Sequence, residues 1–223
     1  FGVADLDTNE PITIDTIFNA GSIAKLFTGI EIMRMYEQGL IDLDASVTQY
    51  LPDFSLQTFW PDSAPITIRD ILTHRSGFYA RGSGLVGWYW DTIPEVLKAQ
   101  AESAAELYQA YPAGHWYKYS NLGYNILGRV IEVVHDLSPP PGSVSAFPYH
   151  MKDVLLNPLG MENSGFGSKA LLYGDTSPQP AAAGYFLQDN KPTAYNRFDI
   201  INLASGNLNT TLRDMQQFAF CIL

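Results

Sequence analysis

The sequence predicts an α+β fold that contains more helix than strand. Apolar residues recur every three or four positions in several stretches, which is typical of helices with one buried face. Extended stretches are short, and strands are expected to be sparse after residue 20. Of the 223 residues 46% are hydrophobic, enough for a sizeable core. No repeat divides the chain, so we expect residues 1–223 to form a single domain.

The N-terminal part is predicted to be extended before a helix begins at Ser22. A short strand, a turn at residues 8–11 and an extended segment at 12–18 precede apolar residues with helical spacing. Gly39 is a natural end for this helix. Its buried face is predicted to consist of Ile23, Leu26, Phe27, Ile30 and Met33.

Capping signals and turn residues place the later helices. A short helix ends before Pro52, and Thr67 with Asp70 has the spacing of a capping box at the start of the next one. Further helices are predicted over 93–109, 122–135 and about 149–156, with loops over 81–91 and the proline-rich 138–142. The last helix has Thr211 as N-cap and a predicted apolar face of Leu212, Met215, Ala219 and Ile222.

Charge and composition exclude several classes of partner. The 13 basic and 23 acidic side chains give a net charge of −10, which argues against a nucleic-acid ligand. No apolar run is long enough to predict a transmembrane segment. The single cysteine, Cys221, excludes an internal disulfide, and its apolar neighbours predict that it is buried.

The histidines give no sequence signal for a metal centre. The four of them are scattered along the chain and no H-E-x-x-H pattern occurs, so neither a metal site nor a cofactor is predicted. They are His74, His115, His135 and His150.

Ser22 and Lys25 have the spacing of a nucleophile and its proton-handling partner. Residues three apart on a helix stand on nearly the same face, one turn from each other. A serine hydroxyl in the first turn lies at the positive end of the helix dipole, but it needs a base to become a nucleophile. Lys25 could be that base if its amine is neutral, or it could remain charged and hold another base ionised. The competing interpretation is an N-cap serine and a solvated lysine.

Tyr119 and Asn121 are the candidates for the second base and for an amide partner. A Tyr119 phenolate, stabilised by charged Lys25, could accept the proton of Ser22, and the Asn121 amide could bond to the lysine and to a substrate carbonyl. Alternatively, Tyr119 could belong to an aromatic cluster that packs the core.

Five ordered stretches give this chain a specific resemblance. They are "FNAGSIAKLFTG", "ITIRDILTHRSGF", "YSNLGYNILG", "NPLGMENSGF" and "ASGNLNTTLRDMQQF". Together they resemble the serine β-lactamase and penicillin-binding-protein family, in particular its class C β-lactamase-related branch. That branch includes D-alanyl-D-alanine carboxypeptidases, D-aminopeptidases and carboxylesterases. The resemblance implies a β-lactamase/transpeptidase-like fold, with a helical lobe and an antiparallel sheet.

The resemblance also implies a role for each site residue. Ser22 matches the acylated serine, Lys25 the motif lysine, Tyr119 the general base and Asn121 the motif asparagine. The amide of Ser22 would form half of the oxyanion hole. His74 matches a structural turn, so we expect it to make a scaffold hydrogen bond.

The resemblance leaves the substrate open among β-lactams, D-alanyl peptides and carboxylic esters. An aromatic loop at 84–92 could line an acyl pocket and mildly favours esters. The alternative is that the chain is a non-catalytic member of the same fold, which binds a peptidoglycan-like peptide or has a regulatory role.

The third motif of the family, Lys-Thr-Gly or His-x-Gly, has no match in this chain. We therefore expect an incomplete domain that lacks the N-terminal helix and the C-terminal strands. These would come from a longer parent or from a second chain. Most relatives implied by the resemblance are exported, to the periplasm or outside the cell, although esterase members can be cytoplasmic.

Overall fold

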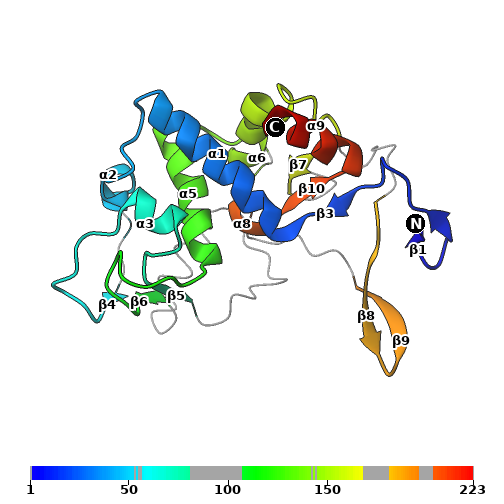
Figure 1. The fold of residues 1–223 in the computed structure, drawn as a ribbon, viewed down its shortest axis with the longest axis horizontal. Helices are drawn as coiled ribbons and strands as arrows, with labels where there is room; N and C mark the ends of the chain where they lie inside the picture. Colours follow the sequence, from blue (N-terminus) through cyan, green and yellow to red (C-terminus); the bar gives the residue numbers. More distant parts are fainter. Residues whose placement is uncertain are drawn as a thin grey trace.

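Two long helices carry the core of the protein in a computed structural model (Figure 1). The structure describes residues 2–52, 54, 57–80, 107–141, 143, 145–167, 181–195 and 203–222. Helices α1 (Ala24–Glu37) and α5 (Asn121–Val134) pack against each other, and the short helix α8 (Leu203–Gly206) contacts both.

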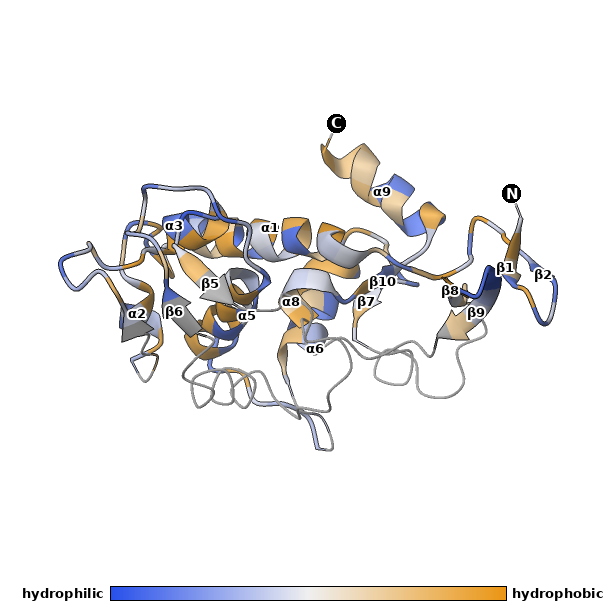
Figure 2. Cartoon of the chain, turned by 90° about the horizontal axis from the view of Figure 1, so that it is seen from below, coloured by the Kyte–Doolittle hydropathy of each residue, from blue (hydrophilic) through white to orange (hydrophobic). Residues whose placement is uncertain are grey.

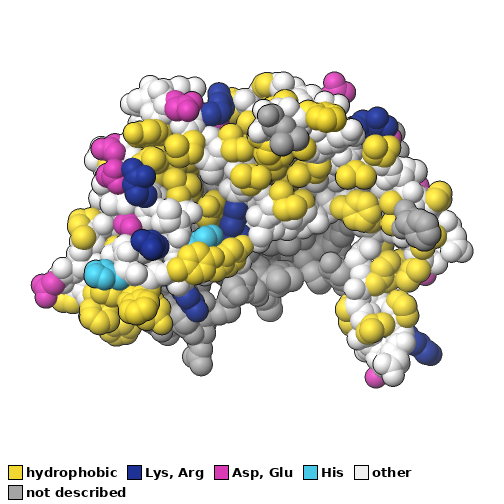
Figure 3. Space-filling view, viewed as in Figure 1, with side chains coloured by type: hydrophobic (Ala, Val, Ile, Leu, Met, Phe, Trp, Pro, Cys, Tyr) yellow, Lys and Arg dark blue, Asp and Glu magenta, His cyan; other side chains and the backbone are white. Residues whose placement is uncertain are grey.

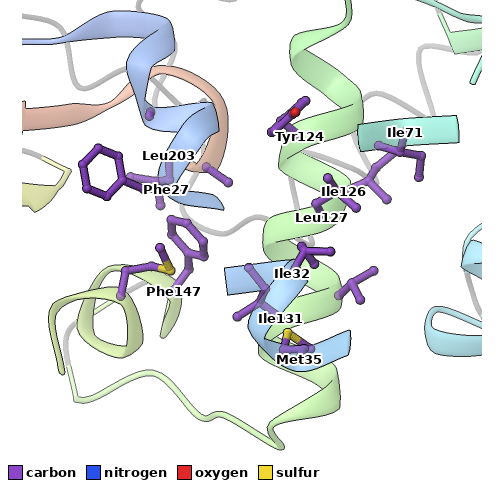
Figure 4. Packing of buried hydrophobic residues seen from close by; sticks show 14 of the residues in the cluster. Phe27, Ile32, Met35, Ile71, Tyr124, Ile126, Leu127, Ile131, Phe147 and Leu203 are labelled. Carbon is purple, nitrogen blue, oxygen red and sulfur yellow. The ribbon is translucent and has the colours of Figure 1, made fainter. Parts of the chain in front are cut away.

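The hydrophobic core lies between these helices. Ile32 and Met35 of α1 lie beside α5, which supplies Ile126, Leu127 and Ile131 (Figure 4). The Phe27 ring of α1 points away from α5 and packs against Phe218, with 4.5 Å between the ring centres. Phe147 of α6 (Phe147–Met151) completes the cluster on one side. Each of these side chains is buried, and burying one such side chain stabilises a fold by about 1.5–3 kcal/mol.

A small antiparallel sheet connects the start of α1 to the C-terminal part of the chain. Its order is β3 (Phe18–Asn19), β10 (Leu208–Thr210) and β7 (Gly165–Phe166). Asn209 pairs with Asn19 in this sheet, and the amide of Ala20 donates to the carbonyl of Leu208 at 2.8 Å. The short helix η1 (Gly21–Ile23) therefore begins beside the segment that links α8 to β10.

The remaining elements surround this centre. Helices α2 (Val47–Tyr50) and α3 (Ile68–Leu72) lie at one end with the sheet β4 (Gln57–Thr58), β6 (Leu107–Gln109) and β5 (Phe78–Ala80). The other elements are β1 (Val3–Asp5), β2 (Glu10–Pro11), η2 (Lys152–Leu156), the hairpin of β8 (Gly184–Gln188) and β9 (Lys191–Tyr195), and α9 (Leu212–Ile222).

The predicted α+β class and most predicted helices are confirmed. Helix α1 ends before Gly39, whose φ of +72° suits a residue without a Cβ. The capping box of α3 forms as expected, because the Thr67 hydroxyl accepts from the Asp70 amide and the Asp70 carboxylate accepts from the Thr67 amide. Helix α5 and the pair α6–η2 lie where the sequence predicts helices.

The expectation of few strands after residue 20 was wrong, since β4 to β10 all lie beyond it. The predicted helix over 93–109 was wrong at its end, because Leu107–Gln109 pair with β5 and β4. Backbone pairing with distant strands overrode the local helical spacing there. The rest of that prediction, and the loop predicted over 81–91, lie outside the described residues.

The predicted buried face of α1 was also wrong in part. Ile23, Leu26 and Met33 are exposed, whereas the polar Thr28 and Glu31 are buried. The Thr28 hydroxyl donates to the carbonyl of Ala204 at 2.7 Å, which removes the cost of burying it. Because α1 is apolar on more than one side, its spacing alone could not determine which side faces the core.

The outer position of α9 overturned two predictions (Figure 2). Leu212 and Ile222 are exposed rather than core-facing, and Cys221 is exposed rather than buried. Phe218 and Asp214 face inward instead. The buried Asp214 carboxylate accepts from the amide of Asn163 at 2.8 Å and so determines which side of α9 is turned inward. Hydrophobic side chains accordingly lie on the surface over α1 and α9 (Figure 3).

Close packing of α5 on α8 depends on a glycine. A Cβ at Gly128 would lie 2.6 Å from the Cβ of Ala204, well inside van der Waals contact. In α1, a Cβ at Gly29 would meet the nearest atom, Cδ2 of Leu72, at an ordinary 3.9 Å. The two helical glycines therefore differ in the space that surrounds them.

We expect Gly128→Ala to destabilise the protein by about 1–3 kcal/mol, because α8 must move away from α5. The control Gly29→Ala should instead stabilise it by up to about 1 kcal/mol through helix propensity. Urea unfolding of both variants measures the difference. Equal effects of the two substitutions would contradict the close packing at Gly128.

Candidate active site

Ser22 presents its side chain on η1 directly after Gly21, a glycine with φ of +53°. Two groups reach its Oγ: Nζ of Lys25 at 3.2 Å and the phenol oxygen of Tyr119 at 2.7 Å. The N-cap positions of η1 and α1 are Ala20 and Ile23, and neither has a side-chain capping bond. The capping interpretation of Ser22 was therefore wrong.

Lys25 is buried among acceptors, so the interpretation as a solvated lysine was wrong too. Only 6% of the residue is exposed. Its Nζ donates to Oδ1 of Asn121 at 2.7 Å and to the carbonyl oxygen of Ser205 in a short hydrogen bond. Nζ also lies 4.8 Å from the ring centre of Tyr119. Burial lowers the pKa of the Lys25 ammonium, and the neighbouring Tyr119 partly opposes that shift.

Tyr119 lies at the edge of the site in the segment that leads into α5. It is 45% exposed, so the alternative of a core-packing residue was wrong for it. The next residue, Ser120, is the N-cap of α5 and accepts from the amide of Gly123 at 3.1 Å. This cap fixes where α5 begins and therefore positions both Tyr119 and Asn121.

His74 contacts the ring of Tyr119 and the backbone of the residue that follows it. Its Nδ1 accepts from the amide of Ser120 at 3.2 Å, which confirms the predicted scaffold hydrogen bond. The His74 ring lies 4.6 Å from the Tyr119 ring, centre to centre. The acceptor role of Nδ1 requires a neutral ring, and burial, together with the charge of Lys25, lowers the pKa of His74.

Ser205 is the contact that sequence reasoning missed. Its backbone carbonyl accepts a hydrogen bond from Lys25. Because every residue has a backbone carbonyl, the amino-acid sequence cannot indicate such a contact. The fold brings together all four predicted residues, Ser22, Lys25, Tyr119 and Asn121. Ser22 and Tyr119, whose hydroxyl groups are in contact, are 97 positions apart in the sequence. The predicted aromatic loop at 84–92 lies outside the described residues.

We expect the stability of the protein to fall as the pH drops below about 6.5, the pKa of an unperturbed histidine. A histidine whose pKa is lowered by folding binds more protons in the unfolded state, so acid favours unfolding down to the folded-state pKa. The variant His74→Asn suits the positive φ of 58° at this position and removes this titration.

The free energy of unfolding of His74→Asn should therefore depend less steeply on pH between 5 and 7, as measured by urea titrations at several pH values in that range. The control His115→Asn makes the same substitution at an exposed histidine. An unchanged slope in His74→Asn would show that His74 is not held neutral.

In the part of the chain that the structure describes, no helix has the length and apolar character needed to cross a bilayer.

Comparison with known proteins shows that one protein-family model matches the whole chain. The family model described as Beta-lactamase matches residues 1–223. Beta-lactamase-like protein 2 of Dictyostelium discoideum is 28% identical over 221 residues, which cover 96% of this chain and 37% of that protein. Esterase EstB of Burkholderia gladioli is 28% identical over 193 residues, or 80% of this chain and 47% of that protein.

Solved structures agree on the fold. The octameric penicillin-binding protein homologue from Pyrococcus abyssi superposes with a TM-score of 0.77 at 27% identity, covering 98% of this chain and 47% of that one. The chain thus spans less than half the length of these relatives.

Proposed function

The chain belongs to the Beta-lactamase family, and on this premise we propose that it is a serine acyl hydrolase that works through an acyl-enzyme on Ser22. One observation carries the proposal: Oγ of Ser22 lies within hydrogen-bonding distance of both the Tyr119 phenol and the Lys25 amine. A hydroxyl between a candidate base and a cation is the arrangement expected of an activated nucleophile.

The contacts of Lys25 are compatible with a charged lysine. Its Nζ lies within hydrogen-bonding distance of Oγ of Ser22, Oδ1 of Asn121 and the carbonyl of Ser205, and an ammonium group has three donors for them. A neutral amine would donate to the last two and accept from the Ser22 hydroxyl, so these contacts suit both protonation states. We propose Tyr119 as the base, as a phenolate beside the Lys25 charge, because its oxygen lies nearer to Oγ of Ser22, at 2.7 Å, than Nζ of Lys25 does, at 3.2 Å.

In the proposed reaction, the Tyr119 phenolate takes the proton of Ser22 while Oγ attacks a carbonyl carbon. The leaving group departs with a proton returned from Tyr119, and an ester on Ser22 remains. Water activated by the same base then releases the acid. The amide of Ser22, in the first turn of η1, has no intrahelical acceptor and is available to the oxyanion.

Amides and esters are both compatible with this chemistry. Among the relatives are an esterase and penicillin-binding proteins, so we keep β-lactams, D-alanyl peptides and carboxylic esters as the candidate substrates. We further propose that residues 1–223 are one domain. The need for a third motif from outside this chain remains a prediction.

Acylation of Ser22 can be tested by intact-protein mass spectrometry. We expect a mass increase after incubation with a fluorophosphonate or a β-lactam, in protein expressed from its complete reading frame. Ser22→Ala should show no increase. Ser63→Ala changes a serine of another surface segment and should react like the wild type. Adduct formation in Ser22→Ala, or none in the wild type, would refute the proposed nucleophile and favour a non-catalytic binding protein.

The role of Tyr119 as the base can be tested by removing its phenol oxygen. Tyr119→Phe should lower the acylation rate by about 10²–10⁴, the usual contribution of a general base. Stopped-flow hydrolysis of a p-nitrophenyl ester measures this rate. Tyr117→Phe is the matched control, because Tyr117 is also exposed and its ring lies 5.7 Å from the His74 ring, centre to centre. A Tyr119→Phe variant with the wild-type rate would return the role of base to Lys25.

A further inference from the structure

A second cluster of chemically active side chains lies at the other end of α1. Glu31 comes from α1, His135 from the C-cap of α5 and His150 from α6. One ligand atom of each residue lies within 4.8 Å of the other two. Glu31 is nine positions beyond Ser22, which corresponds to about 13 Å along a helix, so the cluster is separate from the candidate active site.

We propose that Glu31, His135 and His150 form a binding site for a divalent transition metal of the zinc type. Two imidazole nitrogens and a carboxylate oxygen are ligands that zinc favours, and three protein ligands leave one position for water. The histidines are scattered in the sequence, but the fold brings these two to one carboxylate.

Of the two contacts with Oε1 of Glu31, that of His150 is a hydrogen bond, and that of His135 has the separation found between neighbouring ligands of a metal. In a tetrahedral site with bonds of about 2.0–2.1 Å, neighbouring ligand atoms lie about 3.3–3.4 Å apart. Nε2 of His135 lies 3.3 Å from Oε1 of Glu31, and Nε2 of His150 lies 2.8 Å from the same oxygen. A shift of about half an ångström by His150 would bring its nitrogen to the same separation from Oε1 as that of His135. The ligand atoms lie within 4.8 Å of one another, so a tetrahedral site would also require the two nitrogens to approach each other by up to about 1.4 Å.

The orientation of His135 is the strongest argument. Its Nε2 is buried and has no hydrogen-bond partner among the described residues, even though Oε1 of Glu31 is near. A buried polar atom without a partner costs about 1–3 kcal/mol. A metal ion bound by Nε2 of His135 and Oε1 of Glu31 would supply the partner that Nε2 lacks.

The charge balance favours a cation and sets a limit on its affinity. Glu31 is only 2% exposed, and a buried carboxylate requires compensation by positive charge. The Arg34 guanidinium binds Oε2 and leaves Oε1 for the histidines. Because Arg34 already supplies one positive charge, we expect weaker binding than in a site without an adjacent arginine.

A metal at this position would connect three elements. It would tie the second half of α1 to the end of α5 and to α6, whose N-terminal amides are already held by Glu132. A ligand that binds only the folded state stabilises it by mass action. The readout is thermal stability, which does not depend on Ser22 and therefore tests this proposal separately from the proposed function.

The test uses tag-free protein, stripped with EDTA and titrated with Zn²⁺ and Co²⁺ near pH 7.5. We expect one metal ion per chain by isothermal titration, a rise in the melting temperature reversed by EDTA, and the visible absorption of four-coordinate Co²⁺. Mg²⁺, which prefers oxygen ligands, should have no effect.

Three variants and one control localise the site. His135→Ala, His150→Ala and Glu31→Gln should each weaken Zn²⁺ binding at least tenfold, whereas His115→Ala, an exposed histidine elsewhere, should bind as the wild type does. Glu31→Gln keeps the side-chain shape, so it serves if a histidine variant fails to fold. Absence of binding to the wild type, or binding that survives His135→Ala and His150→Ala, would overturn the proposal.

Discussion

A buried ammonium group needs acceptors for all three of its N–H donors inside the protein, and in this chain that need links three helices. The acceptors around Lys25 come from η1, from the start of α5 and from α8. Each of these contacts also orients part of the candidate active site. If α8 moved away from α1, Lys25 would lose the Ser205 carbonyl, and its charge would be left less compensated in a desolvated position. The packing of α8 on α1 and α5 is therefore a condition for the site chemistry as well as for stability.

The same requirement explains how other buried charges position the outer elements. Glu132 on α5 accepts from the amides of Ala146 and Phe147 at 3.0 Å, which ties α5 to the N-terminus of α6. Asp214 on α9 accepts from the Ser164 hydroxyl at 2.7 Å and so joins α9 to the turn before β7. A carboxylate satisfied by backbone amides or hydroxyls can be buried at little cost, and it selects one orientation of each pair of elements.

Helix α1 carries two clusters that differ in access to solvent. At its start, Ser22 and Tyr119 are exposed while Lys25 is buried, so solvent reaches the Ser22 hydroxyl more readily than the Lys25 amine. Further along, Glu31 is buried below His135 and His150. A nucleophile needs this open approach. A metal ion of the size of zinc needs only converging lone pairs and a small opening.

The sequence alone determined the features that depend on neighbours within one or two turns. The Ser22–Lys25 spacing, the capping box at Thr67 and the end of α1 before Gly39 follow from local geometry. Only the tertiary structure decided which side of α1 is buried, that Leu107–Gln109 pair as a strand, and that a carbonyl meets Lys25. It also brought Glu31 to two histidines that are more than a hundred positions away. These outcomes depend on partners supplied by distant segments, and periodicity records only the spacing within one segment.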